Sequence, residues 1–194
     1  MCSRFEINDT FEEVSLRFDI ANGPDFAPMP EVRPTNRVPV IAAGRNISLL
    51  RWGLEVAWDS KPLINARAET ITQKKTFQPL LANRCLVPAT AYFEWRRDTG
   101  RKIKTRIQLK SGGLFAMAGL TDGDNFTIIT CAPAPAITHI HSRMPVIVNP
   151  GIESHWLNSK LDFSDVADAL KPVADEILDW RDAEAPPRQS DLFG

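Results

Sequence analysis

The chain has 194 residues, 43% of them hydrophobic, which is enough for one domain with a substantial core. No apolar run approaches the roughly 20 residues of a membrane span, and no charged-then-apolar N-terminus indicates a secretory signal, so we expect a cytoplasmic protein without membrane contact. The net charge of -1 is unevenly distributed: residues 1–150 carry 19 Lys and Arg against 14 Asp and Glu, and residues 151–194 carry 4 against 10.

Short extended segments dominate the chain. We expect strands at residues 2–7, 38–42, 47–54, 64–69, 85–95, 102–110, 114–120 and 126–131. The expected helices are short: one opened by the capping box Thr10–Glu13, and others over 70–81, 150–156 and 164–170. Many strands and few helices without regular alternation predict an α+β fold, a single domain over residues 2–180 with an antiparallel or mixed, barrel-like sheet. Residues 181–194 are expected to form a flexible linker and tail.

Cys2 is the most informative residue for the chemistry. Trimming of Met1 would leave a chain that begins with an α-amine and a thiol on one residue, with pKa values of roughly 8 and 8.5. Such an aminothiol attacks an aldehyde twice, first forming an imine and then closing a thiazolidine ring. The alternative is that Cys2 is an incidental terminal residue. Together with Cys85 and Cys131 it lacks metal-ligand spacing, so we expect free thiols, no metal and no cofactor.

Polar side chains alternate in two of the expected strands. Asn65, Arg67 and Glu69 would share one face, where an amide beside a guanidinium suits a phosphate or sugar oxygen. Glu94 stands between two large aromatic residues, which can raise the pKa of a carboxyl group and suit it to acid–base work. The alternative for both segments is a solvated strand face.

Two of the three histidines lie close together. His139, His141 and Arg143 would share a face if the segment were extended, and histidine is the natural proton shuttle near neutral pH. A purely structural histidine is the competing interpretation, more so for His139 than for His141.

Basic and aromatic residues offer a surface for nucleic acid. Arg51-Trp52 is typical of a site that stacks an unpaired base, the alternative being a core tryptophan; Trp58 is expected in the core. A basic block can follow a phosphate backbone, or else form a solvated hairpin. Its members are Arg96, Arg97, Arg101, Lys102, Lys104, Arg106 and Lys110.

Seven short motifs in one order resemble the SRAP family, the SOS-response-associated peptidase domain. They are Met1-Cys2 with Arg4-Phe5, Pro34-Thr35 with Val38–Ile41, Arg51–Leu54, Ile64–Thr70, Arg84–Ala89, Phe93–Trp95 and His141–Pro145. Each is weak alone, but their order over residues 2 to 157 is a specific signal. The resemblance implies a sensor of abasic sites in single-stranded DNA, whose N-terminal cysteine forms a thiazolidine cross-link with the ring-opened sugar aldehyde.

The resemblance also implies a role for each matching residue. Cys2 would be the nucleophile, and Asn65 would orient the reacting sugar or the N-terminus. Glu94 would move protons during imine formation, and His141 would assist ring opening and the reverse reaction. The expected DNA contacts are Arg4, Trp52, Leu54, Arg67 and Arg143. The family name further implies autoprocessing, the removal of residues ahead of the cysteine.

Three positions depart from the family pattern. Ser3 stands where glycine is usual, and Ala91-Tyr92 replaces Gly-Phe or Gly-Tyr ahead of Glu94. Val32-Arg33 replaces Tyr-Asn ahead of Pro34-Thr35, which removes the usual side chains from that loop and adds the charge of Arg33.

The C-terminal tail carries a second motif. Gln189, Leu192 and Phe193 resemble the peptide that bacterial replication proteins insert into the β sliding clamp, with Gln189 at the pocket rim and the two apolar side chains inside. This predicts tethering of the protein to replication sites on the nucleoid. The alternative is that Leu192-Phe193 folds back onto the domain.

Three classes of function follow from these patterns. The leading interpretation is a monomer that captures abasic sites in single-stranded DNA and shields them. The second is a thiol peptidase or autopeptidase that uses Cys2 with Glu94 and His141. The third is a non-catalytic single-strand binder recruited by the clamp. Replacement of Cys2 by serine separates the first two, since a stable thiazolidine cannot form without the thiol.

Overall fold

Two sheets make up most of this computed structural model, which describes residues 2–183. The five-stranded sheet has the order β15-β10-β9-β1-β2. Its strands are β1 (Arg4–Ile7), β2 (Met29–Val32), β9 (Ala91–Asp98), β10 (Arg101–Leu109) and β15 (Leu178–Asp182). The eight-stranded sheet contains β3 (Arg37–Ala42), β4 (Asn46–Trp52), β7 (Asn65–Arg67), β8 (Arg84–Ala89), β11 (Phe115–Thr121), β12 (Asn125–Cys131), β13 (Met144–Pro145) and β14 (Ile147–Val148).

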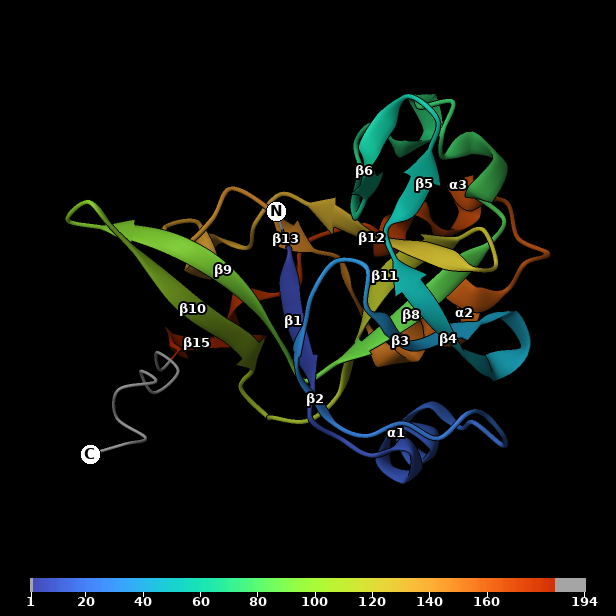
Figure 1. Cartoon of the computed structure of the whole chain (residues 1–194), viewed down its shortest axis with the longest axis horizontal. Helices are drawn as coiled ribbons and strands as arrows, with labels where there is room; N and C mark the ends of the chain where they lie inside the picture. The colour runs from blue at the N-terminus through green and yellow to red at the C-terminus, as the bar shows by residue number, and fades with distance from the viewer. Residues whose placement is uncertain (1, 184–194) are drawn as a thin grey trace.

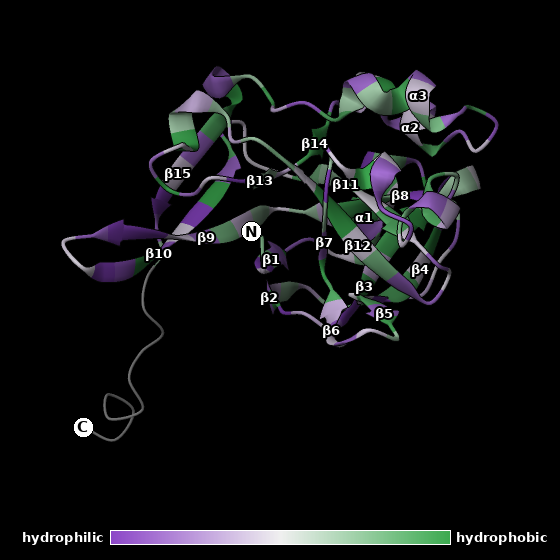
Figure 2. Cartoon of the chain, turned by 90° about the horizontal axis from the view of Figure 1, so that it is seen from above, coloured by the Kyte–Doolittle hydropathy of each residue, from purple (hydrophilic) through white to green (hydrophobic). Residues whose placement is uncertain are grey.

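Five strands of the larger sheet close into a barrel. The path β12-β4-β3-β8-β11 returns to β12, because β11 pairs with β12 as well as with β8. Only the β12–β4 step in this path is parallel. The barrel-like α+β fold expected from the sequence is therefore confirmed, and Figure 2 shows apolar residues concentrated in the barrel strands.

The helices are short and lie outside the barrel. In α1 (Phe11–Phe18) the predicted capping box is confirmed: the Glu13 amide donates to Thr10 Oγ1 at 3.3 Å and the Thr10 amide donates to Glu13 Oε2 at 2.7 Å. Near the C-terminal end, α2 (Glu153–Leu157) and α3 (Phe163–Val166) overlap the helices predicted over 150–156 and 164–170, and each extends past its predicted range by a single residue. The helix expected over 70–81 is wrong. That segment contains two separate 3-10 turns, the second of which includes Pro79.

The strand expected over residues 85–95 is divided between the two sheets. It breaks at Thr90, whose amide donates to the Glu6 carbonyl at 2.9 Å, so β8 stays in the barrel and β9 joins β1. Further strands were not expected: β2 in the proline-rich segment, the two-stranded sheet of β5 (Leu54–Val56) with β6 (Asp59–Leu63), the short β13 and β14, and β15. Since β15 runs to Asp182, the ordered fold passes the expected boundary at residue 180.

The N-terminal strand lies where the two sheets approach each other. In Figure 1, β1 is seen between the β9–β10 hairpin and the barrel strands. Its Phe5 ring packs edge-on against Trp52 of the barrel, with ring centroids 5.0 Å apart. The short segment ahead of β1, which begins with Cys2, is thereby held at a junction of the fold. Within residues 2–183, no helix combines the length and apolarity that crossing a lipid bilayer demands.

Candidate active site

Cys2 lies at the meeting point of β1, β7 and β9. Its side chain is fully buried, and its Sγ donates to the Arg4 carbonyl at a distance of 3.7 Å. The Asn65 side chain reaches it from the barrel, with Nδ2 donating to the Cys2 carbonyl oxygen at 2.8 Å. Two residues that are 63 positions apart in sequence are thus joined by one short hydrogen bond.

The barrel fixes the position of Asn65 from two sides. β7 pairs in parallel with β12, where Ile128 is the partner of Asn65. The indole N–H of Trp52 donates to the Ile64 carbonyl at 2.9 Å, which anchors the residue just before Asn65. The Asn65 Oδ1 atom is buried and accepts no hydrogen bond from any described residue. Because a buried acceptor without a donor is costly, this oxygen is available to a group that enters the site.

Glu94 and His141 face each other beside Cys2. The His141 Nε2 atom lies 3.7 Å from Glu94 Oε2, and the carboxylate is almost entirely buried. Burial raises the pKa of Glu94 to about 7, so both protonation states are populated near neutral pH. The pKa of His141 is lowered, again mainly by burial. Glu94 can therefore both accept and donate a proton at neutral pH, and the His141 ring lies within reach of such a transfer.

The His141 ring has a backbone partner in either protonation state. The Arg143 amide donates to Nδ1 at 3.0 Å, which places the proton of the neutral ring on Nε2, the nitrogen that faces Glu94. The Arg143 carbonyl oxygen lies 3.2 Å from the same Nδ1 and can accept from it once the ring is protonated. The ring can therefore gain or lose a proton without moving.

Arg143 is engaged in holding this loop in place. Its guanidinium forms a two-point ion pair with Glu69, at 2.6 and 2.9 Å, and also donates to the Thr130 carbonyl of β12. The two other arginines predicted to contact DNA are more open: Arg67 is exposed on β7, and Arg4 retains about a quarter of its side-chain exposure. The charges surrounding Cys2 thus include cations that a DNA strand can reach.

The prediction that Trp52 and Leu54 pack against a base is wrong, because both side chains are buried. Trp52 lies between Phe5 and Phe126, with its ring stacked on Phe126 at a centroid distance of 6.4 Å. Trp58, which was expected in the core, is 69% exposed in the turn between β5 and β6. Trp58 therefore offers an exposed indole.

The predicted common face of His139, His141 and Arg143 is also wrong. The chain runs through a 3-10 turn at Pro135–Ile137 and further turns up to residue 140, so strand alternation does not apply. The His139 ring instead packs edge-on against Trp180, with centroids 4.8 Å apart. This is the structural role that the competing interpretation gave to His139.

Tyr92 was not identified as a site residue from the sequence. It lies two positions before Glu94 on β9, and its buried hydroxyl has no hydrogen-bond partner among the described residues. Its pKa is raised, mainly by burial and further by the nearby Cys2 and Glu94 groups. The signal that could have found it is strand alternation, which places Tyr92 on the same face as Glu94.

The proposed clamp-binding residues Gln189, Leu192 and Phe193 lie outside the described residues. Their role stays a prediction from the sequence.

Comparison with known proteins gives consistent matches along the chain. The family model described as SOS response associated peptidase (SRAP) matches residues 1–185. "Abasic site processing protein YoaM" of Bacillus subtilis is 40% identical over 195 residues, covering 88% of this chain and 85% of its own. "Abasic site processing protein HMCES" of Mus musculus is 32% identical over 184 residues, covering 68% of this chain and 50% of its own.

Solved structures have the same fold. A crystal structure of a protein from Bacteroides thetaiotaomicron superposes with a TM-score of 0.84 at 27% sequence identity, covering 94% of this chain and 92% of the other. A second, from Bordetella bronchiseptica, has a TM-score of 0.81 at 24% identity and covers 95% of this chain and all of its own.

Proposed function

This chain belongs to the SOS response associated peptidase (SRAP) family, and from that premise we propose that it captures abasic sites in single-stranded DNA covalently through Cys2. The observation that carries the proposal is the hydrogen bond that Asn65 Nδ2 donates to the Cys2 carbonyl oxygen at 2.8 Å, next to the Glu94–His141 pair. Relatives that are named abasic site processing proteins support the choice of substrate.

The chemistry requires a free α-amine on Cys2, and hence the loss of Met1, which ordinary methionine trimming achieves. The amine adds to the C1′ aldehyde of the ring-opened sugar, and the resulting carbinolamine loses water to give an imine. Cys2 Sγ then adds to the imine carbon while the thiol proton passes to nitrogen, which closes the thiazolidine. One water molecule leaves, one C–N bond and one C–S bond form, and no redox partner is needed.

The surrounding groups fit the proton transfers in these steps. Glu94, with its pKa of about 7, accepts a proton from the attacking amine and returns one to the departing hydroxyl group. His141 relays protons between Glu94 and the opened sugar through Nε2. The unpartnered Oδ1 of Asn65 accepts a hydrogen bond from the α-amine or from a sugar hydroxyl.

The DNA strand would be held by cations and by an exposed ring. Arg4 and Arg67 supply charge for backbone phosphates, and Trp58 in the β5–β6 turn supplies an exposed ring for a base. The captured sugar, closed into a ring with a buried residue, would be shielded from strand cleavage.

The environment of the thiol favours this reaction over peptide hydrolysis. Burial raises the pKa of the Cys2 thiol well above its ordinary value, and the Glu94 charge adds to the shift. A thiol peptidase works through a thiolate, which these surroundings disfavour at neutral pH. A neutral thiol can still add to an imine when a base such as Glu94 takes its proton.

The test is a denaturing gel of the Met1-trimmed protein with single-stranded DNA that carries one abasic site. We expect a heat-stable shifted band that requires both Cys2 and the aldehyde. The controls are Cys2→Ala, intact DNA and a duplex. Cys2→Ser keeps the amine but cannot form the thiazolidine, so its band should need borohydride reduction to survive. Absence of a band with trimmed wild-type protein would refute the proposal.

A further inference from the structure

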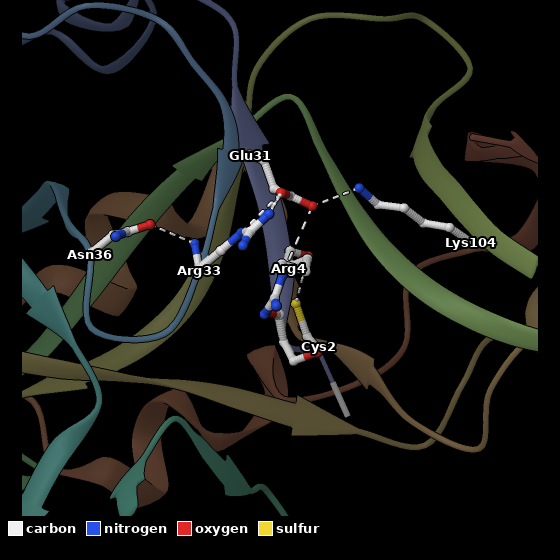
Figure 3. A network of polar contacts seen from close by, with 7 residues as sticks. Cys2, Arg4, Glu31, Arg33, Asn36 and Lys104 are labelled. Carbon is white, nitrogen blue, oxygen red and sulfur yellow. Dashed lines mark hydrogen bonds and ion pairs between the residues drawn. The ribbon is translucent and has the colours of Figure 1, made fainter. Parts of the chain in front are cut away.

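Three cations from three separate segments converge on one carboxylate beside Cys2. Glu31 of β2 receives Lys104 Nζ at 2.7 Å and Arg33 Nη2 at 2.6 Å, and Arg4 Nε lies 3.9 Å away. Figure 3 shows the carboxylate of Glu31 at the centre of this network, with Cys2 directly next to Arg4. We call Arg4, Glu31, Arg33 and Lys104 the Glu31 cluster.

The fold holds each cation of the cluster in place. The Arg33 amide donates to Asn36 Oδ1 at 2.8 Å, and the Asn36 amide donates back to the Arg33 carbonyl at 3.0 Å, so Arg33 sits on a closed turn. Lys104 lies on β10 with its Nζ 4.2 Å from the centre of the Phe93 ring. The cations are therefore already arranged before any ligand arrives.

The cluster is open to solvent and carries surplus positive charge. Arg4, Glu31 and Lys104 keep between 27% and 29% of their side-chain exposure, and Arg33 keeps 62%. Within residues 2–183, Glu31 is the sole carboxylate that forms an ion pair with any of the three cations. One carboxylate cannot neutralise three cations, so the position that it occupies is attractive to a more highly charged acceptor.

We propose that Arg4, Arg33 and Lys104 form a binding site for a DNA backbone phosphate next to the abasic sugar, and that Glu31 occupies this site until DNA displaces it. The inference rests on the proposed function, since it assigns the DNA contact that accompanies capture. Phosphate and carboxylate oxygens accept the same charge-assisted hydrogen bonds, and the arginine fork fits either. Because Arg4 is two residues from Cys2, a phosphate bound here belongs to a nucleotide that adjoins the captured sugar.

Glu31 affects both the free protein and its binding to DNA. In the free protein it holds the cations together, and in binding it competes with the phosphate. Hydrogen bonds from Lys104 and Arg33 lower the pKa of Glu31 to about 2, so the carboxylate stays charged across the pH range in which DNA is handled. Only another anion can then release the three cations. The Glu31 carboxylate thus keeps the three cations ordered in the free protein, and it lowers the affinity for DNA because it competes with the phosphate.

The test measures equilibrium binding to a single-stranded oligonucleotide with a tetrahydrofuran abasic analogue, which has no aldehyde and cannot be cross-linked. We expect Glu31→Gln, which keeps the shape of the side chain, to bind about three- to tenfold more tightly than wild type. Asp168→Asn is the matched control. It removes the same charge from an exposed ion pair with Lys171 and should leave binding unchanged.

A scan of the oligonucleotide locates the phosphate. In this scan, one phosphate linkage at a time is replaced by an uncharged methylphosphonate. At one linkage beside the analogue, we expect the replacement to abolish the difference in affinity between Glu31→Gln and wild type. Arg33→Gln should weaken binding more in the Glu31→Gln background than in wild type, because Glu31 no longer competes for its guanidinium. Thermal unfolding of each variant verifies that the fold is intact.

The outcomes separate the two proposals. The phosphate site is refuted if folded Glu31→Gln binds the oligonucleotide no more tightly than wild type. It is also refuted if Glu31→Gln keeps its tighter binding whichever linkage is replaced. Cross-linking to DNA with a true abasic aldehyde is measured on the same preparations. Retained cross-linking without a Glu31 effect refutes the phosphate site alone, whereas a Glu31 effect without cross-linking refutes covalent capture alone.

Discussion

At the scale of single residues, the site combines groups that would each be unfavourable elsewhere. The carboxyl group of Glu94 is buried, and so is the amide oxygen of Asn65, which has no hydrogen-bond partner among the described residues. Burying such groups costs folding free energy unless they are fully hydrogen-bonded. Their concentration at one junction is typical of a functional site rather than of a core.

The first prediction at this scale concerns catalysis by Glu94. We expect Glu94→Gln to slow cross-linking by about 100-fold or more, because the amide neither accepts nor returns a proton. Wild-type rates should show an inflection near pH 7, from the Glu94 pKa of about 7, and the variant should lose it. Single-turnover gel assays from pH 5 to 9 measure both effects. The exposed Glu12→Gln serves as control, and an unchanged pH profile in Glu94→Gln would contradict the assigned role.

The same substitution should stabilise the protein. The Glu94 pKa of about 7 in the fold lies above its ordinary value of 4.5, so the folded state retains a proton that the unfolded state has lost. Stability therefore falls as pH rises from about 4.5 to 7, and the loss is complete above the folded pKa. Glu94→Gln should raise the melting temperature more at pH 8 than at pH 4, as thermal scans would show.

At the scale of elements, the basic residues of the β9–β10 hairpin fall into two groups, those that form ion pairs and those that stay exposed. Three members of the basic block form ion pairs: Arg96 with Asp182, Lys104 with Glu31 and Arg106 with Glu6. Others stay exposed towards the outer end of the hairpin, which is the hydrophilic arm in Figure 2. They are Arg97, Arg101 and Lys102. The block therefore both joins β9 and β10 to neighbouring strands and leaves charge for a phosphate backbone.

The prediction at this scale contrasts two tryptophans. Trp58→Ala, in the exposed β5–β6 turn, should weaken binding to single-stranded DNA by about 1–3 kcal/mol and leave the melting temperature nearly unchanged. Trp52→Ala should instead destabilise the fold by about 3–5 kcal/mol, because the ring is buried between Phe5 and Phe126. Fluorescence anisotropy and thermal unfolding measure the two effects. Full DNA affinity in Trp58→Ala would show that no base stacks there.

At the scale of the whole molecule, the site exists because two sheets meet. Cys2 directly precedes the segment that forms β1, and Glu94 lies on β9, so both come from the five-stranded sheet. Asn65 lies on β7 of the eight-stranded sheet, and His141 lies in the loop that precedes β13. No single sheet carries all four groups. Damage to the β1 pairing with β9 would therefore separate the nucleophile from its acid–base partner.

The prediction at this scale concerns the C-terminal tail. A peptide of residues 181–194 should bind a bacterial β sliding clamp, and Phe193→Ala should abolish that binding, because the ring is expected to fill the clamp pocket. Peptide titration by anisotropy measures the affinity, and Arg188→Ala is the matched control. Equal binding by the Phe193→Ala peptide would refute the clamp motif. Deletion of residues 184–194 should leave cross-linking itself unchanged.

The sequence by itself determined the features that depend on local order. The capping box at Thr10, the many strands and the identity of Cys2, Asn65, Glu94 and His141 as candidates all follow from residue type and spacing, since side chains alternate along strands and caps need particular oxygens. In the structure Asn65 contacts Cys2 and His141 faces Glu94, while the roles of these residues stay predictions.

The tertiary structure decided what depends on distant partners. Burial of Trp52 and exposure of Trp58 could not be read locally. Each tryptophan is followed or preceded by a charged residue close by, and only the packing of Trp52 against Phe126 in the closed barrel distinguishes them. The break at Thr90 depends on a hydrogen bond to Glu6, 84 positions away. The Glu31 cluster likewise needs β1, β2 and β10 in one sheet, where β9 lies between β10 and β1. Contacts between remote segments are set by packing, which no local pattern encodes.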